Sequence, residues 1–176
     1  MDFNSRWFLP SFFHIGGEME KLKFYEINKS YLNFLKTYDS KVPNQDYKIN
    51  DKFFCGVVLE IDGFKYFVPV SHYNKQDNTN FVIKHKGNSI ASLRFCFMIP
   101  VSEEYITYKD FSKEDDKKYV KLLDTEIEYC RDHQEEILKK ALKVYKIGCN
   151  DRHPLNKYCC DFKKLEEVQN MYNNFI

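Results

Sequence analysis

The chain has 176 residues and a mass of 21.2 kDa, with 43% hydrophobic, 30% charged and 17% aromatic residues. This size and composition are typical of one globular domain and exclude a disordered or fibrous protein. Mean hydropathy is −0.59, and no stretch reaches the roughly 20 apolar residues of a membrane-spanning helix. The 27 Lys and Arg nearly balance the 26 Asp and Glu, so net charge alone predicts no nucleic-acid partner, although it leaves room for a local basic face.

The first 18 residues differ from the rest of the chain. Their apolar residues are interrupted by Pro10, and they lack the lysine-rich start and long apolar run of a signal peptide. Met19 follows a Gly-Gly pair and is a plausible alternative start. We therefore interpret residues 1–18 as a leader or appended segment and residues 19–176 as one domain.

Strands and helices are expected in the following order. The strand candidates are residues 22–27, 53–61, 64–70, 81–84 and 89–98, with a short one near 106–108. The helix candidates are a segment capped by Asn28 that stops before Pro43, a long segment from Ser112 to Gly148 with a second cap at Asp132, and a terminal helix from Asp161. This order predicts an α+β fold, a mostly antiparallel sheet with helices on one side.

The clearest local signal is a β-hairpin around the Asp-Gly turn at residues 62–63. A two-residue turn fixes the pairing of the strands, so Ile61 is expected opposite Phe64, and Phe54 opposite Ser71. The same register sets Lys52 opposite the residue at position 73 and diagonal to Ser71. A β-bulge or sheet edge is expected near position 69, where a proline lacks an N–H.

Polar groups gather where this hairpin ends. They are Ser71, His72, Asn74 and Lys75 after the second strand, and Tyr47, Lys48 and Lys52 before the first. Ammonium groups supply positive charge, hydroxyls donate hydrogen bonds and imidazole moves a proton near neutral pH, so the set suits an anion, phosphate in particular. The alternative from the residues alone is that the lysines are solvated and the Ser-His pair is an ordinary turn.

Other chemistry-bearing residues give weaker signals. The six cysteines include no CxxC pair, which favours reduced, mostly buried thiols of a cytosolic protein over a disulfide framework or a zinc site. His85 and His133 are expected to be exposed polar residues. A loop contact is one alternative for His153, but an ordinary loop residue is the preferred interpretation. The sequence contains no HExxH, Gly-rich phosphate loop or GxSxG motif.

Four segments together resemble a known family. They are Phe24-Tyr25-x-Ile27 with Tyr38-Asp39-Ser40-Lys41-Val42-Pro43-Asn44 after the first helix, Gly56-Val57-Val58-Leu59-Glu60-Ile61 leading to Pro69 and Ser71, Met98-Ile99-Pro100-Val101, and Cys160-Asp161-Phe162-Lys163-Lys164-Leu165-Glu166. In this order and spacing the chain resembles the ToxN/AbiQ family, the endoribonuclease toxins of type III toxin–antitoxin systems. The resemblance extends from about residue 21 to about residue 172.

The resemblance implies a fold, an activity and partners. The fold is a twisted antiparallel sheet with flanking helices, similar to the core of the Kid/MazF toxins. The activity is RNA cleavage in the bacterial cytoplasm without a metal or other cofactor, by attack of the ribose 2′-hydroxyl, which leaves a 2′,3′-cyclic phosphate. The partners are RNA substrates and a small structured antitoxin RNA. The toxin cuts that RNA from a repeat precursor, is inhibited by it, and forms closed toxin–RNA assemblies with it. Such systems also act in phage defence by abortive infection.

Matching the family's motifs position by position assigns candidate catalytic residues. These are Tyr47, Lys52, Ser71 and His72, with the family's following lysine at Asn74 or Lys75. Lys52 and Lys75 would stabilise charge on the phosphorane, while the hydroxyl and imidazole groups would orient or transfer protons. His72 replaces a hydroxyl residue of the family, and one extra residue lies between Tyr47 and Lys52.

Two further residues are assigned to RNA contacts. Lys41 is expected to contact a backbone phosphate. Arg94 stands where the family usually has an uncharged residue, and it is also expected to touch RNA. With Asn74 and Lys75, these residues make up the predicted RNA-binding set.

Two other functions compete with this one. A non-catalytic RNA-binding module on the same fold would bind RNA without cleaving it. A small-ligand phosphatase would need a metal site or a cysteine nucleophile, and although Cys159 and Cys160 stand beside Asp161, the glycines of a nucleophile loop are missing.

Overall fold

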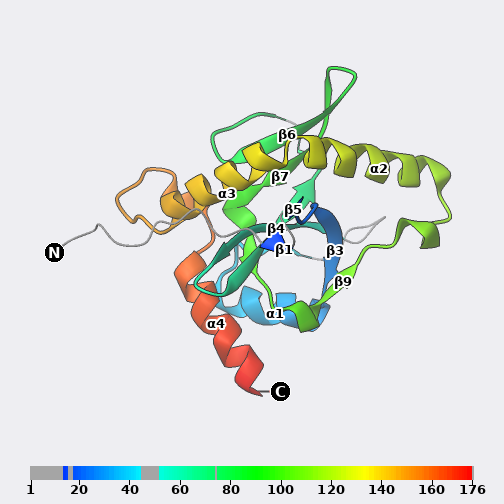
Figure 1. Ribbon diagram of the computed structural model, residues 1–176. Coiled ribbons are helices and arrows are strands. Elements are labelled where there is room, and N and C mark those ends of the chain that lie inside the picture. Colours follow the sequence, from blue (N-terminus) through cyan, green and yellow to red (C-terminus); the bar gives the residue numbers. More distant parts are fainter. Residues whose placement is uncertain (1–13, 16–17, 45–51, 74, 176) are drawn as a thin grey trace.

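The computed structural model describes residues 14–15, 18–44, 52–73 and 75–175 (Figure 1). A seven-stranded sheet, antiparallel in every described pairing, runs in the order β6-β7-β5-β4-β3-β9, and β8 pairs with β5. The α+β prediction is therefore confirmed.

The described elements have the following bounds. The strands are β1 His14–Ile15, β2 Glu18–Met19, β3 Lys23–Ile27, β4 Phe54–Ile61, β5 Phe64–Ser71, β6 Asn80–His85, β7 Asn88–Arg94, β8 Ile99–Pro100 and β9 Ile106–Tyr108. The α-helices are α1 Lys29–Tyr38, α2 Lys117–Asp132, α3 Gln134–Gly148 and α4 Phe162–Phe175. The 3₁₀ turns are Phe95–Phe97, Glu103–Tyr105, Phe111–Lys113 and Asn156–Tyr158.

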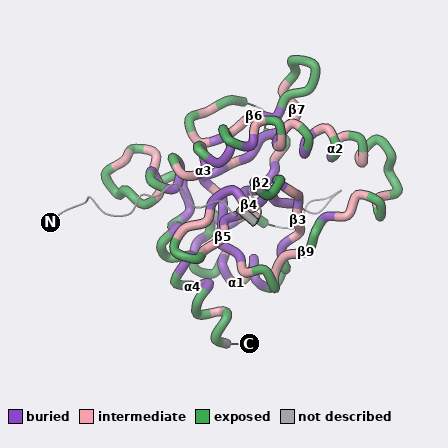
Figure 2. Tube along the Cα trace, viewed as in Figure 1, coloured by how far each residue is buried: buried purple, intermediate pink, exposed green. Residues whose placement is uncertain are grey.

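Two sets of helices flank the central strands. In Figure 1, α2 and α3 follow one another above the central strands, and α1 and α4 lie together below them. Figure 2 shows that burial is concentrated in the central strands and in the helix faces turned toward them. Fully buried Tyr66 on β5 joins these layers, because its hydroxyl donates to Glu166 Oε1 on α4 at 2.8 Å, and Tyr145 on α3 donates to the same oxygen at 2.7 Å.

The long helix begins later than its sequence predicts. The expected cap Ser112 lies in a 3₁₀ turn, and the side chain of Asp116 instead accepts from the N–H groups of Lys118 and Tyr119. The predicted break near Asp132 is confirmed, because α2 ends there and α3 begins at Gln134. The predicted strand 89–98 is too long, since β7 ends at Arg94 and a 3₁₀ turn follows.

The β4–β5 hairpin follows its predicted register only near the turn. Ile61 pairs with Phe64 as expected, but Phe54 pairs with Pro69 instead of Ser71. The register shifts between Cys55 and Leu59, so the bulge lies in β4 and not near Pro69 as predicted.

The packing at Gly56 explains why this bulge contains a glycine. Three residues of β4, from Gly56 to Val58, stand opposite the single Phe67 of β5. A Cβ on Gly56 would overlap the Phe67 ring. The bulge therefore brings the β4 backbone against an aromatic ring, which only a residue without a side chain permits.

The segment after β2 is anchored to the helices. Gln134, at the start of α3, accepts from the Leu22 N–H at 3.1 Å and donates from Nε2 to the Glu20 carbonyl at 2.8 Å. Upstream, β1 pairs with β2 as a separate two-stranded sheet. The division into residues 1–18 and 19–176 stays a prediction. None of the described helices has the length and apolar character needed to cross a membrane.

Candidate functional site

Three of the predicted site residues, Lys52, Ser71 and His72, lie at the carboxyl end of β5. Ser71 is the last residue of β5 and is half-buried, and His72 follows it and is exposed. The β4–β5 register observed at Phe54, continued by two residues, sets half-buried Lys52 directly opposite Ser71. Directly opposed residues have Cβ atoms about 5 Å apart. The predicted position of Lys52, diagonal to Ser71 and opposite Tyr73, is thus corrected to a closer one.

The backbone that carries this register is hydrogen-bonded up to the site. The Val70 N–H donates to the Phe53 carbonyl at 3.1 Å, one residue before the pair formed by Lys52 and Ser71. On its other edge, β5 pairs with β7, where Ser71 stands opposite Ser92. The position of Ser71 is therefore set by the strands on both edges of β5.

The loop after β5 is held by a buried asparagine. Asn80, which is 1% exposed, donates from Nδ2 to the Lys75 carbonyl at 2.7 Å and accepts from the Asp77 N–H at 2.9 Å. Its Oδ1 also accepts from Gln76 Nε2 at 3.0 Å. Because Asn80 uses both ends of its amide on this loop, the exposed Lys75 side chain stands on an ordered backbone.

Arg94 lies between two aromatic rings beside the same loop. Its guanidinium carbon is 4.9 Å from the centre of the Tyr73 ring and 4.5 Å from that of Phe97. This cation–π arrangement orients the guanidinium plane. Arg94 also lines a hollow of about 340 Å³ together with Asp77, Asn78, Thr79, Cys96, Phe97, Leu155 and Tyr158. The hollow combines a fixed cation, hydrogen-bonding groups and exposed ring faces.

Cys96, which lines this hollow, is one of a pair of thiols. Cys159 donates a hydrogen bond to Cys96, with the two sulfur atoms 3.4 Å apart. That hydrogen bond lowers the pKa of Cys96 to about 7 and raises the pKa of Cys159. All six cysteines are free and all but Cys149 are buried, as the sequence predicts.

Lys41 lies against the backbone that carries one of these thiols. Its Nζ donates to the Cys159 carbonyl at 2.5 Å, and its N–H donates to Asp39 Oδ1 at 2.9 Å. Asp39 Oδ2 accepts from the Asp161 N–H at 2.7 Å, which ties this turn to the start of α4. Lys41 is therefore engaged with the chain's own backbone, and its assignment to a phosphate contact stays a prediction.

Two assigned residues, Tyr47 and Asn74, lie outside the described residues, so their roles stay predictions. Within the described parts of the chain, no group of three or more His, Cys, Asp or Glu side chains stands close enough to hold a metal ion.

Tyr73 and Asn80 belong to the candidate site, but they were not identified from the sequence. Tyr73 is 41% exposed, and an aromatic residue directly after Ser-His was a signal that could have been used. Asn80 gave no such signal, because an asparagine at the start of a strand is usually a turn residue, and only its burial shows that it organises the loop.

The comparisons with known proteins decide the family. The family model described as "Toxin ToxN, type III toxin-antitoxin system" matches residues 23–170. The chain belongs to the ToxN toxin family. Endoribonuclease ToxN of Pectobacterium atrosepticum is 29% identical in an alignment 159 positions long, and the match covers 83% of this chain and 91% of that protein. Endoribonuclease ToxN of Bacillus thuringiensis subsp. kurstaki is 31% identical, with coverage of 82% and 81%. Endoribonuclease AbiQ of Lactococcus lactis subsp. lactis is 27% identical, with coverage of 94% and 97%.

Solved structures of ToxN and AbiQ relatives share the fold. A toxin whose structure concerns selective inhibition by a non-coding RNA pseudoknot superimposes with a TM-score of 0.80 at 28% identity, covering 88% of this chain and 99% of that one. AbiQ, a lactococcal anti-phage endoribonuclease of a type III system, superimposes with a TM-score of 0.78 at 27% identity and the same coverage.

Proposed function

We propose that this member of the ToxN family is an endoribonuclease toxin that cleaves RNA at the carboxyl end of β5. The observation that carries the proposal is the placement of Lys52 directly opposite Ser71, with His72 as the next residue. An ammonium, a hydroxyl and an imidazole at one sheet end are the groups that phosphodiester cleavage by an internal nucleophile requires.

RNA cleavage by the ribose 2′-hydroxyl needs no added reactant. The ribose 2′-oxygen attacks the adjacent phosphorus and loses its proton, and the bond from phosphorus to the 5′-oxygen breaks as that oxygen takes up a proton. The products are a 2′,3′-cyclic phosphate and a 5′-hydroxyl. His72, with Ser71 and Tyr47, transfers or orients these protons, and Lys52 with Lys75 stabilises the negative charge of the phosphorane.

Arg94 and Tyr73 offer the RNA a second set of contacts beside the cleaved linkage. The guanidinium supplies charge to phosphate, and the exposed ring of Tyr73 supplies a face on which a base can stack. Lys41 and Asn74 complete the proposed RNA contacts.

The wider role follows from the relatives. The proposed partner is a small structured antitoxin RNA, cut from a repeat precursor by the toxin and then inhibitory to it, in a closed toxin–RNA assembly. One relative is a toxin inhibited by an RNA pseudoknot, another is anti-phage, and a third belongs to an antiviral system regulated by a processed non-coding RNA. Acting on RNA of the cell or of a phage requires the bacterial cytoplasm as the site of action.

The test is the chemistry of the RNA ends. Purified protein is incubated with end-labelled RNA in the presence of a chelator, and the products are analysed for a 2′,3′-cyclic phosphate. A strand with a 2′-deoxy residue at the cleaved position should be resistant. A 5′-phosphate product, or loss of cleavage on chelation, would refute this mechanism.

Substitutions then test the site. Lys52→Ala and His72→Ala should each slow cleavage about 100-fold or more. Lys121→Ala on α2 and His85→Ala at the end of β6 are matched controls, because both side chains are exposed and stand on other elements. If Lys52→Ala and His72→Ala both cleave RNA at the wild-type rate, the assignment of these residues to the active site is wrong. Tight RNA binding with no cleavage by the wild type would favour the non-catalytic module.

A further inference from the structure

Two adjoining hollows lie along α3. The smaller, of about 410 Å³, is lined by Lys139, Leu142, Lys143, Lys146, Ile147, Asn150 and His153. The larger, of about 570 Å³, is lined by Gln76, Asn80, Phe81, Val82, Lys84, Tyr129, His133, Glu136, Lys139, Lys140 and Lys143. Lys139 and Lys143 line both, so the two hollows form one surface, here called the α3 groove.

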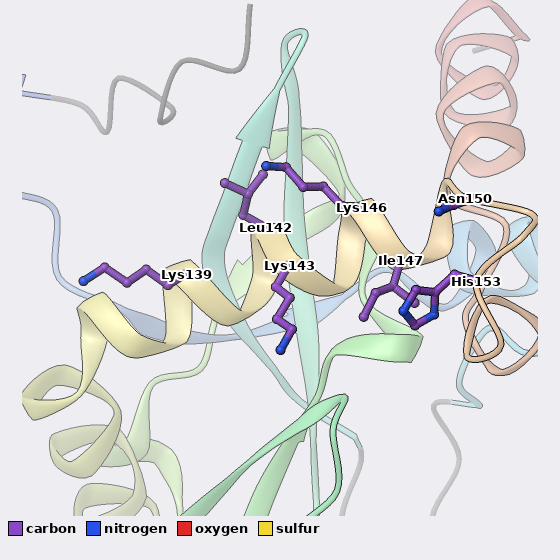
Figure 3. Close-up of a pocket in the computed structure, with 7 residues that line it drawn as sticks. All are labelled: Lys139, Leu142, Lys143, Lys146, Ile147, Asn150 and His153. Carbon is purple, nitrogen blue, oxygen red and sulfur yellow. The ribbon is translucent and has the colours of Figure 1, made fainter. Parts of the chain in front are cut away.

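Lysines form a continuous stripe along this groove. Lys139, Lys143 and Lys146 follow at helical spacing over about 10 Å of the axis. Figure 3 shows Lys143 on the same side of α3 as Ile147, with the His153 ring beside Ile147. Lys140 lies close to Lys143: burial and the charge of Lys143 lower the pKa of Lys140, an effect that Asp77 partly opposes.

Nearby carboxylates only partly offset this charge. Glu135 pairs with Lys139 at 3.6 Å, and both side chains are largely exposed, so the pair is weak. Four lysines and one glutamate line the larger hollow, and among the described residues three lysines and no carboxylate line the smaller. The groove therefore suits a ligand with several negative charges in a row.

An aromatic shelf stands beside the lysines. The rings of Tyr129 and His133 are stacked with centres 4.1 Å apart, and Phe81 lies 6.1 Å from Tyr129 and 5.8 Å from His133. All three are half-buried, so part of this shelf faces the groove. Ring faces next to cations are the combination that binds unpaired nucleotides, through base stacking and phosphate contacts.

The groove borders the loop that follows the candidate cleavage site. Gln76 and Asn80 form its wall, and Asn80 holds the Lys75 backbone in the loop that begins at Ser71 and His72.

We propose that the α3 groove binds the unpaired RNA strand flanking the linkage at Ser71 and His72. The inference rests on the proposed function for the identity of the ligand. It assigns to α3 a role in holding a long RNA that is separate from the cleavage chemistry.

Binding to two non-cleavable RNAs of different length tests the role of the lysines. The probes are a 2′-O-methyl tetranucleotide, too short to leave the site, and a single-stranded 2′-O-methyl RNA several times longer. The double variant Lys140→Ala, Lys143→Ala should bind the long strand about tenfold or more weakly. Its affinity for the tetranucleotide should be the same as that of the wild type. The slope of log affinity against log salt should fall in magnitude by about 1.4, the value for two phosphate contacts on a single strand.

The matched control is Lys118→Ala with Lys121→Ala. These exposed lysines have the same spacing on α2 and the same change in net charge, but they do not line the groove. The control should keep the wild-type slope and affinity.

A second variant tests the aromatic shelf by a different readout. Tyr129→Leu keeps an apolar side chain but removes the stacking face, so it should weaken binding of the long strand roughly fivefold or more. Stacking is not electrostatic, so the salt slope should not change. Circular dichroism and thermal melting establish that each variant is folded.

The outcomes separate the two proposals. If the wild type binds long RNA through these lysines but cleaves none, the groove assignment stands and the catalytic one fails. If the wild type cleaves RNA and the groove variants bind the long strand as the α2 control does, the groove assignment is overturned. Equal loss of tetranucleotide binding would likewise overturn it, because it would place the effect in the cleavage site.

Discussion

Asn80 donates a hydrogen bond of 2.7 Å from its Nδ2 to the carbonyl oxygen of Lys75, five residues earlier in the chain. With the bond that its Oδ1 accepts from Asp77 N–H, this single amide determines the course of the loop after β5. The loop carries Lys75, which is assigned to RNA binding, so the position of that residue's backbone depends on a buried side chain.

We predict that Asn80→Ala loosens this loop. The change removes the partner of the Asp77 N–H and of the Lys75 carbonyl, so the free energy of unfolding should fall by about 0.5 to 1.5 kcal/mol for each lost hydrogen bond. Urea unfolding measures the loss, and hydrogen exchange should show a faster Asp77 amide. Asn80→Asp keeps the acceptor for Asp77 and should retain part of that protection. An unchanged Asp77 exchange rate in Asn80→Ala would contradict the anchoring role.

The position of Arg94 between two aromatic rings predicts that its charge and its planar shape contribute separately to RNA affinity. Arg94→Lys keeps the charge but loses the planar group held between Tyr73 and Phe97. RNA affinity should fall by about 0.5 to 2 kcal/mol with no change in salt slope. Arg94→Gln should lower the slope as well, by about 0.7. Equal slopes in all three proteins would mean that Arg94 contacts no phosphate.

Glu126 makes stability depend on pH. It is 1% exposed, its Oε1 has no described hydrogen-bond partner, and burial raises its pKa from 4.5 to about 7. Below pH 4.5 the carboxyl is protonated in the folded and the unfolded chain. As the pH rises toward 7, the unfolded chain releases this proton first, so the stability of the folded state falls.

We therefore expect Glu126→Gln to gain stability relative to the wild type as pH rises. The gain should be absent below pH 4.5 and reach about 3 kcal/mol above pH 7, by the conversion of about 1.4 kcal/mol per pKa unit. Urea unfolding of both proteins at the two pH extremes provides the measurement. A difference that stays constant with pH would show that the pKa of Glu126 is the same in the folded and the unfolded chain.

The hydrogen bond between the two thiols should change the pH dependence of cysteine alkylation. Cys96 has a pKa of about 7 because Cys159 donates a hydrogen bond to it, and it lines the hollow beside Arg94. Its modification by a small alkylating reagent, followed by mass spectrometry, should rise with a midpoint near pH 7. Cys159→Ala should move the midpoint toward 9, whereas Cys159→Ser, which can still donate, should move it less. Identical midpoints in all three proteins would contradict the hydrogen bond.

The sequence predicted most of the elements because their signals are local. Asn28 caps α1 as expected, with its side chain accepting from Tyr31, and the Asp-Gly turn set the first pairs of the hairpin. The start of α2 was misjudged because Ser112 and Asp116 are both good caps, and only packing selects between them.

The candidate site was predicted in its membership but not in its geometry. Lys52 and Ser71 were both identified, yet their relative position depended on a bulge that counting from the turn could not include. The close approach of the Phe67 ring to Gly56, which makes that bulge, is a contact between two strands and leaves no pattern in either one. Asn80 and the Arg94 stack likewise depend on tertiary contacts.

The bulge in β4 has a consequence for how this protein tolerates insertions and deletions. Its two additional residues have no partners of their own on β5, so the pairing of Phe54 with Pro69 does not depend on how many there are. Removing a single residue between Cys55 and Leu59 would shorten the bulge and leave the lysine before β4 opposite the serine at the end of β5. We therefore expect a one-residue deletion in this stretch to keep the reactive groups in place, whereas a substitution of those groups would not be tolerated.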